Sequence, residues 1–506
     1  MTLAMMRSGA LRGIEGLPVD VEADIGSGLP AFNIVGLPDT SVQEARERVR
    51  AAIRNTGFEF PLRRITVNLA PADVRKEGPL YDLSIAAAVL VASGQITDRF
   101  TDTALFGELS LDGRLRHIPG VLPFVAMCAQ KGIGSVVVPM EDVAEARSVG
   151  GVRIYGLDSL RQIAEPFESW PDAPVVEVSE GDCTVLEAHD LATVQGQEHV
   201  KRALEVAAAG GHNLLMQGPP GSGKTLLARA LPGLLAPLTP AEAIDVAKVY
   251  SVAGLLNRER PLMRERPFRA PHHTISHAGL VGGGSHIRPG EVSLAHRGIL
   301  FLDEFPEFGA TALEALREPL ESGSLTISRA RGSVTFPARV LLVAAMNPCP
   351  CGYYGDPVRA CTCPDATVTR YQRRVSGPLL DRIDLFIDVP RVEFKELTGE
   401  TTGERSETVR ARVVEARERQ AARFHGTSTV ANSEMGPLDV RKYCQAQLEA
   451  AAQPLLAAAM QQLGLSARSF HRVLKVARTI ADLAGSERIL TPHLAEAVQY
   501  RRRGAE

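Results

Sequence analysis

The sequence has no long hydrophobic run, little excess of either charge, and a single tryptophan among 506 residues. No stretch approaches the roughly 18 uninterrupted apolar residues of a membrane helix, and residues 1–10 lack the apolar core of a signal peptide. The formal net charge of −3 predicts neither nucleic acid nor membrane as a partner, so any such contact requires a local basic surface. The seven cysteines do not resemble a secreted disulfide framework. We therefore expect a cytoplasmic protein without a membrane partner, long enough for about two to four domains.

What the sequence does contain is a phosphate-binding loop. The apolar strand predicted over 214–217 leads into a segment that fits the pattern G-x-x-x-x-G-K-[ST], and a helix is predicted over 226–235. Backbone N–H groups of such a loop surround phosphates at a helix N-terminus. Lys224 is expected to reach the β- and γ-phosphates of ATP, and the Thr225 hydroxyl to ligate Mg²⁺. The nucleotide-binding residues are then Gly218, Pro219, Pro220, Gly221, Ser222, Gly223, Lys224 and Thr225.

Two further polar clusters follow predicted strands. Residues 299–302 are apolar and precede Asp303 and Glu304, and a strand predicted over 340–345 precedes Asn347. In open α/β sheets, side chains at the carboxyl ends of strands gather around the ligand. We expect Asp303 to hold Mg²⁺, Glu304 to activate the attacking water, and Asn347 to contact that water or the γ-phosphate. For Asn347, capping of the following turn is the alternative role.

Strands and helices alternate through residues 1–165, which we expect to form an α/β domain. Its segments 76–83 and 107–120 resemble the Lon-type protease fold, also described as ribosomal protein S5 domain 2-like. That family uses a serine and a lysine as its catalytic pair. Leu80 and Leu122 stand at those positions here, and neither side chain is a nucleophile or a base. The resemblance therefore implies the fold without peptidase activity.

A degenerate domain of this kind is also similar to the C-terminal domain of the bacterial RadA recombination helper, which serves DNA binding and ring formation. Four basic residues of this domain could contact DNA phosphates: Arg63, Arg64, Arg75 and Lys76. A solvated charged rim is at least as good an interpretation of these residues. Residues 166–189 contain several prolines and acids, which predict an extended linker between this domain and the next.

Residues 190–392 resemble the α/β core of AAA+ ATPases, and residues 393–506 resemble their all-helical lid. In these ATPases the residues just before the first helix pack on adenine, which makes Val194 and Gly196 the candidates here. Segment 376–384 matches the arginine-finger segment of the magnesium-chelatase and MCM-like branch. The resemblance implies that Arg382, oriented by Asp381, stabilises the phosphoryl group in a neighbouring subunit. A surface ion pair is the alternative for Arg382.

The lid sequence contains a second arginine candidate. Ser466 is the predicted N-cap of a helix over 466–484. The family pattern implies that Arg468, in the first turn, contacts the γ-phosphate, with Arg472 as the alternative. The basic end, 501–503, is predicted to be a frayed terminus rather than a DNA site.

Two insertions mark the branch. Segment 264–296 contains His272, His273 and three consecutive glycines; the spacing is not that of a zinc site, and the glycines predict a mobile loop. The resemblance implies that this segment is the helix-2 insert of the branch, which faces the central pore. Alternation over 325–336 predicts a β-hairpin with Arg329 and Arg331 at its tip. Such a tip can follow a DNA backbone, and an edge hairpin kept soluble by charge is the equal alternative.

Four of the cysteines lie close together in the sequence. Cys349, Cys351, Cys361 and Cys363 form the pattern C-x-C-x9-C-x-C. Four thiolates suit tetrahedral Zn²⁺, although the usual two-residue gap of a zinc knuckle is missing. We expect a structural zinc site, with free thiols as the alternative.

Across almost its whole length the sequence resembles the YifB/ComM family of magnesium-chelatase-like AAA+ ATPases, notably at 201–204, 268–274, 346–352 and 476–481. The family implies a homohexameric DNA helicase that uses ATP and Mg²⁺ to drive branch migration during natural transformation. Three alternatives stay open. The first is a magnesium-chelatase motor acting on porphyrin, which the extra N-terminal domain and the cysteine cluster disfavour. The second is an ATP-dependent protease, which Leu80 and Leu122 oppose, and the third is a protein-remodelling ATPase.

Overall fold

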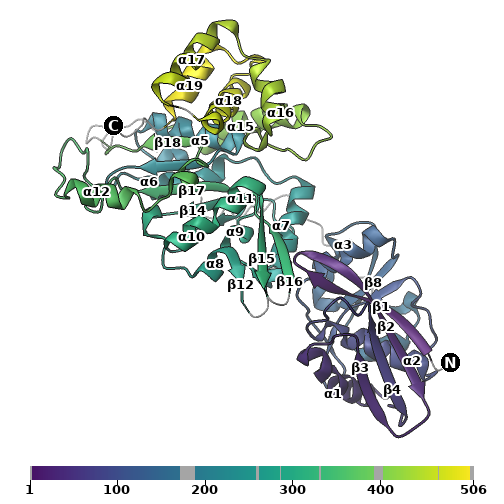
Figure 1. The fold of residues 1–506 in the computed structure, drawn as a ribbon. Helices are drawn as coiled ribbons and strands as arrows, with labels where there is room; N and C mark the ends of the chain where they lie inside the picture. Colours follow the sequence, from purple (N-terminus) through teal and green to yellow (C-terminus); the bar gives the residue numbers. More distant parts are fainter. Residues whose placement is uncertain are drawn as a thin grey trace. The chain divides into compact units, whose positions relative to one another are not determined.

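The structure is a computed structural model that describes residues 3–170, 189–257, 261–284, 287–329, 332–392, 403–464 and 466–501. The chain forms two compact units (Figure 1). The first takes in the described residues of Met1–Asp182, Thr239–Met263 and Ser328–Phe336. The second takes in those of Cys183–Leu238, Arg264–Ile327 and Pro337–Glu506. The fold class predicted from the sequence is confirmed, with mixed α/β layers and a helical C-terminal region.

The first unit is built on a seven-stranded sheet with the order β3-β4-β2-β1-β5-β8-β9. The strand β1, which the sequence analysis missed, pairs antiparallel with β2 in a register that places Met6 opposite Val21. Both of these side chains are fully buried. The strands are β1 (Leu3–Arg12), β2 (Glu15–Gly26), β3 (Ala31–Val35), β4 (Arg64–Ala70), β5 (Thr103–Leu105), β8 (Ser135–Pro139) and β9 (Arg153–Leu157), with a separate hairpin of β6 (Glu108–Leu109) and β7 (Leu115–Arg116).

Four α-helices accompany this sheet: α1 (Thr40–Asn55), α2 (Asp82–Ala92), α3 (Val121–Lys131) and α4 (Val143–Arg147). Every residue of α2 is buried, because its alanines and branched aliphatic side chains allow close packing on all sides. Leu80 and Leu122, at the positions of the Lon catalytic pair, belong to the buried apolar residues. The fold is therefore present with leucines in place of both catalytic groups.

The chain stays packed against the first unit beyond the expected boundary at residue 165. The Trp170 ring lies 4.6 Å from Phe167 and 5.3 Å from Tyr155, and its indole N–H donates to the Gln162 carbonyl at 2.8 Å. The Arg99 guanidinium stacks 5.0 Å from the Phe167 ring. The first residues of the expected linker are thus part of the aromatic core, because a lone tryptophan gains more from burial than from an extended path in water. Residues 171–188 lie outside the described part of the chain.

A second departure from the expected boundaries is helix α7 (Pro240–Ala253), which belongs to the first unit although its sequence lies within 190–392. It packs against α3. The Ser251 hydroxyl donates to the buried Glu145 carboxylate at 2.5 Å, and the backbone N–H of Leu122 donates to the same oxygen at 2.9 Å. These bonds satisfy an acid whose pKa burial raises. The sequence analysis predicted no element for this segment and did not indicate which core it joins.

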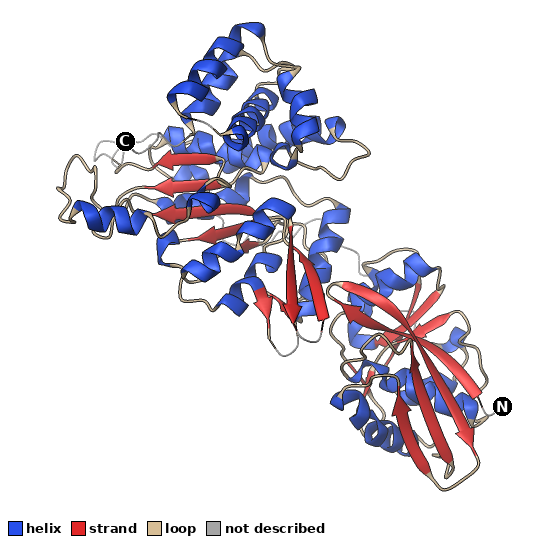
Figure 2. Ribbon diagram, viewed as in Figure 1, coloured by secondary structure: helices blue, strands red, loops and turns tan. Residues whose placement is uncertain are grey.

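The second unit is built on a five-stranded parallel sheet with the order β11-β14-β17-β10-β18. Figure 2 shows these strands running in one direction with helices around them. Alternate residues face different cores: Leu214 and Met216 pack into one apolar cluster and Leu215 into another, as expected for a sheet covered on both faces. The strands are β10 (Leu214–Gln217), β11 (Phe268–Arg269), β14 (Ile299–Leu302), β17 (Leu341–Met346) and β18 (Leu385–Asp388).

The helices and hairpins of this core include both predicted insertions. The helix after the phosphate-binding loop ends at Ala230 rather than at 235, because Pro232 lacks the N–H that an α-helix needs and a 3₁₀ turn follows. The remaining elements are α5 (Glu198–Gly210), α6 (Lys224–Ala230), α8 (His277–Val281), α9 (Glu291–Leu294), α10 (Ala310–Ala315), α11 (Arg317–Ser322), α12 (Asp365–Gln372), α13 (Gly377–Leu380) and the hairpins β12 (Gly282–Gly283) with β13 (Arg288–Pro289) and β15 (Ser324–Arg329) with β16 (Gly332–Pro337). The described residues of Ser328–Phe336, the outer part of the second hairpin, are grouped with the first unit.

The C-terminal lid is helical and packs on α5 of the core. Ser466 caps α18, since its side chain accepts from the Ser469 N–H at 3.2 Å as predicted. Helix α17 begins only at Gln453, because the N–H groups of the preceding residues bond to other partners, including the Ile489 carbonyl. The lid elements are α15 (Ser406–Arg423), α16 (Pro437–Val440) with a π turn (Arg441–Gln445), α17 (Gln453–Gln462), α18 (Ala467–Leu483) and α19 (Thr491–Gln499).

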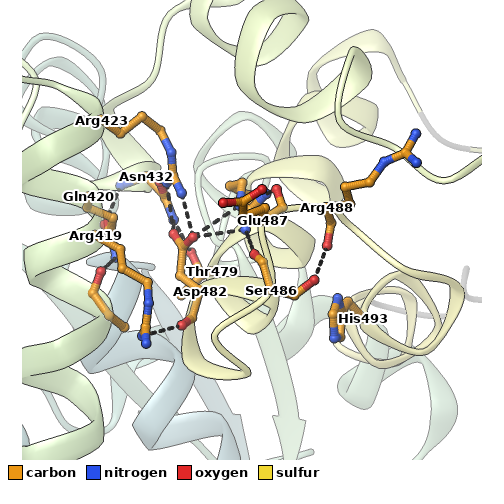
Figure 3. Close-up of polar contacts among 12 residues, drawn as sticks. Arg419, Gln420, Arg423, Asn432, Thr479, Asp482, Ser486, Glu487, Arg488 and His493 are labelled. Carbon is orange, nitrogen blue, oxygen red and sulfur yellow. Dashed lines mark hydrogen bonds and ion pairs between the residues drawn. The ribbon is translucent and has the colours of Figure 1, made fainter.

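A buried charge network holds α15 and α18 together (Figure 3). The Asp482 carboxylate accepts hydrogen bonds from Arg423 at 2.5 and 2.8 Å, from Arg478 at 3.1 Å and from the Asn432 amide at 2.8 Å. Burial lowers the pKa of Arg478, and Asp482 opposes this shift. A buried carboxylate bonded by two guanidinium groups requires all its partners, so the network fixes the geometry of the lid.

Candidate functional site

The polar residues predicted for the nucleotide site meet at one edge of the parallel sheet. Strands β10 and β14 both flank β17, so their carboxyl ends lie side by side. The Thr225 hydroxyl donates to Asp303 Oδ2 at 2.8 Å. Lys224 Nζ lies 3.3 Å from Asn347 Oδ1. Three segments that are more than forty residues apart in sequence thus form one constellation at the ends of β10, β14 and β17, the last two of which are labelled in Figure 1.

The glycines give the loop its shape. A Cβ on Gly218 would lie 2.2 Å from the Val389 carbonyl oxygen, so no side chain fits there. Gly221 and Gly223 have φ angles of +75° and +86°, which favour glycine. Lys224 is 8% exposed, and its Nζ donates to the Gly218 and Pro219 carbonyls at 2.8 Å each. Burial lowers the pKa of Lys224 while Asp303 opposes the shift, so a bound anion would stabilise the ammonium form.

Hard oxygen ligands for Mg²⁺ are present in this constellation. The Thr225 hydroxyl and the Asp303 carboxylate are already hydrogen-bonded to each other, and the Glu304 N–H donates to Asp303 Oδ1 at 2.9 Å. A hydroxyl beside a carboxylate is the donor set that Mg²⁺ takes together with phosphate oxygens. The residues therefore fit the metal that the phosphate-binding loop implies.

The structure places His273 on Glu304. His273 Nδ1 lies 2.9 Å from Glu304 Oε2, while the neighbouring His272 contacts the Thr274 hydroxyl at 2.8 Å instead. Glu304 itself has a φ angle of +52°, an unfavourable backbone conformation for a residue with a side chain. The pairing of β11 with β14 precedes this contact in the chain, and the expectation that both histidines face a pore stays a prediction.

This contact gives an expected result for His273→Ala. Loss of the imidazole frees the Glu304 carboxylate, and we expect the rate of ATP hydrolysis without any effector to change at least about threefold, since a hydrogen bond to a charged group contributes about 1.5–3 kcal/mol. The matched control is His272→Ala, which removes a neighbouring ring whose centroid lies 4.2 Å from that of His273 without removing the Glu304 contact. Equal rates for wild type and His273→Ala would contradict a functional contact.

Arg382 and Arg468 meet at one carboxylate, Glu321. Arg382 is 6% exposed, and it bonds to Glu321 Oε2 and to the carbonyls of Pro378 at 2.7 Å and Arg317 at 3.2 Å. Arg468 Nη2 lies 3.8 Å from Glu321 Oε1, and its side chain is 67% exposed. The hydrogen bond from Arg382 lowers the pKa of Glu321. Among the described residues, neither arginine has a hydrogen bond or ion pair to residues 218–225.

Arg472, the alternative to Arg468, is engaged elsewhere. Its Nη1 donates to Asp384 Oδ1 at 2.8 Å, and the Asn213 N–H donates to Oδ2 at 3.0 Å. Burial by itself would raise the pKa of Asp384, but Arg472 and His212 outweigh it and hold the pKa below its ordinary value. Arg501, expected to be frayed, is 9% exposed and donates to the Ile383 carbonyl at 3.1 Å; residues 502 and 503 lie outside the described part.

Gln197 is a loop-supporting residue that the sequence analysis missed. Its amide donates to the carbonyl of Ser222 at 2.8 Å and to that of Pro390 at 2.9 Å, and its φ angle is +57°. The adenine candidates Val194 and Gly196 stand just before it, with Val194 buried. The only sequence signal for Gln197 was its place between a glycine and a helix start, which does not reveal a contact with a loop 25 positions away.

The basic residues proposed for DNA contact have different environments. Arg63 and Arg64 are exposed, and Arg75 pairs with Glu77 at 3.0 Å. Lys76 is fully buried and donates to the Pro71 carbonyl, so the expectation of a phosphate contact there is incorrect. Burial lowers its pKa. Arg329 is exposed at the end of β15, while Arg331 lies outside the described residues.

The four clustered cysteines come together in space. All four Sγ atoms lie within 4.8 Å of one another, and Cys349 is fully buried. They follow Asn347 directly along the chain, and so they lie next to the nucleotide constellation.

Comparisons with known proteins agree with this geometry. Family models for the magnesium chelatase subunit ChlI match residues 21–142, 190–397 and, as its C-terminal part, 403–501. The protein YifB of Escherichia coli is 44% identical over 99% of this chain and 97% of its own length. The competence protein ComM of Haemophilus influenzae is 44% identical over 99% of this chain and 98% of its own. Lon protease 2 of Bacillus subtilis is 27% identical over 24% of this chain and 21% of its own. No helix of the described residues is long and apolar enough to span a bilayer.

Proposed function

Since the chain belongs to the YifB/ComM family of magnesium-chelatase-like AAA+ ATPases, we propose that its ATP hydrolysis drives a homohexameric ring along DNA. The finer proposal is branch migration of recombining strands during natural transformation, in the cytoplasm and without porphyrin as substrate. The observation that carries the ATPase part is the joint placement of Lys224, Thr225, Asp303 and Asn347 within hydrogen-bond range.

The residues divide the work of hydrolysis as follows. Lys224 would leave the loop carbonyls to bind the β- and γ-phosphates, and the loop N–H groups would cradle them. Thr225 and Asp303 would hold Mg²⁺, which supplies neutralisation of phosphate charge when bound. Glu304 would accept the proton of the attacking water, and Asn347 would orient that water or the γ-phosphate.

The arginines support a site shared between subunits. Arg382 and Arg468 lie together at Glu321 and have no contact with residues 218–225 of the same chain among the described residues. Because both guanidinium groups contact the same carboxylate, we infer that both serve the ATP of the same neighbouring subunit, with Glu321 holding them until it binds. Such sharing supports the proposed ring, since each subunit would then supply what the next one lacks.

The DNA part of the proposal is supported by the full-length relative named as a competence protein. The exposed Arg329 on the β15–β16 hairpin offers a positive charge for a phosphate backbone. A protein-remodelling ATPase is the second candidate, since the chelatase family models match on ATPase segments that carry no information on the substrate.

The test is ATP hydrolysis by the whole chain with and without single-stranded and forked DNA. We expect DNA to stimulate hydrolysis, and Arg329→Ala to weaken that stimulation most at low salt, because loss of a phosphate contact reduces the counterion release on which binding depends. Arg54→Ala, an exposed arginine at the end of α1, serves as the control. Absence of both stimulation and strand separation would exclude the DNA motor and leave the remodelling ATPase.

A further inference from the structure

The cysteine cluster has the geometry of a tetrathiolate metal site. The Sγ atom of Cys349 lies 3.3 Å from that of Cys351 and 3.7 Å from that of Cys361, and the last two lie 3.6 Å apart. Cys363 completes the group within 4.8 Å. Zn²⁺ bound to four thiolates at about 2.3 Å requires S–S separations of about 3.8 Å, so small shifts would accommodate the ion.

The loop that carries two of these cysteines rests on the phosphate-binding loop. Gly352 has a φ angle of +87°, and a Cβ placed on it would lie 2.4 Å from Cδ and 2.6 Å from Cγ of Pro220. Its N–H donates to the Cys349 carbonyl at 3.0 Å, which closes a tight turn around the cluster. The turn therefore touches Pro220 without room for a methyl group between them.

The other end of the same turn leads to the γ-phosphate position. Asn347 precedes it and contacts Lys224, and the Pro348 carbonyl accepts from the Gln372 amide at 3.1 Å. The segment 347–352 is thus held against both Pro220 and Lys224. Within segment 349–363 the Arg359 guanidinium donates to the Tyr353 hydroxyl at 3.0 Å, and the clustered thiols join the two ends of the segment.

We propose that the four cysteines bind one Zn²⁺ and that the metal-closed turn supports the phosphate-binding loop through Gly352 and Pro220. Four thiolates in one place repel each other without a cation, and a bound ion converts them into a cross-link that orders both ends of the segment. The bound zinc then determines how well the phosphate-binding loop is ordered for ATP, and so it affects the affinity for ATP. This inference rests on the proposed ATP site and is independent of DNA.

The first measurement is the metal content of the purified whole chain. We expect one zinc ion for each chain, and loss of that ion in Cys361→Ser together with Cys363→Ser, while Cys128→Ala, a buried cysteine of the first unit, keeps it. Protein without stoichiometric metal, or with iron in its place, would overturn the zinc assignment whether or not the chain hydrolyses ATP.

The second measurement tests the support of the loop. Gly352→Ala would force a methyl group into Pro220, so we expect zinc content to stay the same and the Kd for ATP to rise at least about fivefold. Gly355→Ala is the matched control, because Gly355 also has a positive φ angle, +77°, but a Cβ there meets nothing within 4 Å. Equal ATP affinity for both variants would overturn the coupling. Absence of ATP binding by wild type would instead reject the ATP site itself.

Discussion

Glu304→Gln is expected to reduce the rate of ATP hydrolysis by about 10²–10⁴-fold while ATP still binds. The amide keeps the shape of the side chain but cannot take a proton from water. Lys224, Thr225 and Asp303 are unchanged in the variant, so the phosphates and the metal keep their ligands. The measurement combines single-turnover hydrolysis with an equilibrium assay of ATP binding.

Glu307→Gln provides the control for this result. Glu307 is also an exposed acid, three positions further along the chain, but it pairs with Arg374 at 2.6 Å. Its replacement is expected to leave hydrolysis near the wild-type rate. A Glu304→Gln variant that keeps more than about a tenth of the wild-type rate would show that another group activates the water.

Arg382→Ala is expected to lower hydrolysis by about 10³–10⁵-fold, the range found when an arginine finger is removed. The decisive test mixes this variant with Lys224→Ala. Each variant alone lacks one half of every site, whereas a mixed ring contains some interfaces with an intact Lys224 from one subunit and an intact Arg382 from the next. We therefore expect the mixture to regain part of the activity.

Two comparisons guard this interpretation. Arg382 is mostly buried, so Arg382→Lys tests whether a positive charge alone restores the fold and the rate of ATP hydrolysis. The lysine ammonium is a point charge and lacks the planar fork of a guanidinium. Arg391→Ala removes an arginine that pairs with Asp356 at 2.9 Å, and it is expected to be active. A mixture no more active than its parts would place Arg382 in a structural role.

The sequence predicted the groups whose positions follow from local chain order. A loop after β10, two acids after β14 and an amide after β17 must meet, because parallel strands end at one edge. The roles assigned to these residues remain predictions, but their proximity required only strand order. The cysteine pattern likewise implied a cluster, since its members lie within fifteen positions.

Contacts made by long side chains between distant elements were not predictable. Nothing in the sequence around His273 indicates that it reaches Glu304, or that Glu321 gathers Arg382 and Arg468. Arg501 and Lys76 were assigned to solvent because basic residues are usually exposed, whereas backbone carbonyls bind both in the interior. Burial of such groups depends on acceptors supplied by tertiary structure.

Helix α7 has a consequence for dissecting the protein. The helix belongs to the first unit, but the residues on either side of its segment, Leu238 and Arg264, belong to the second unit. A fragment starting at residue 190 would therefore carry α7 without α3, leaving Ser251 and the adjoining apolar side chains without their partner. Neither unit is a contiguous stretch of sequence, so neither can be expressed alone by deleting one end of the chain. A separate second unit instead requires polar replacements of the residues of α7 that face α3, because these would otherwise form an exposed apolar patch.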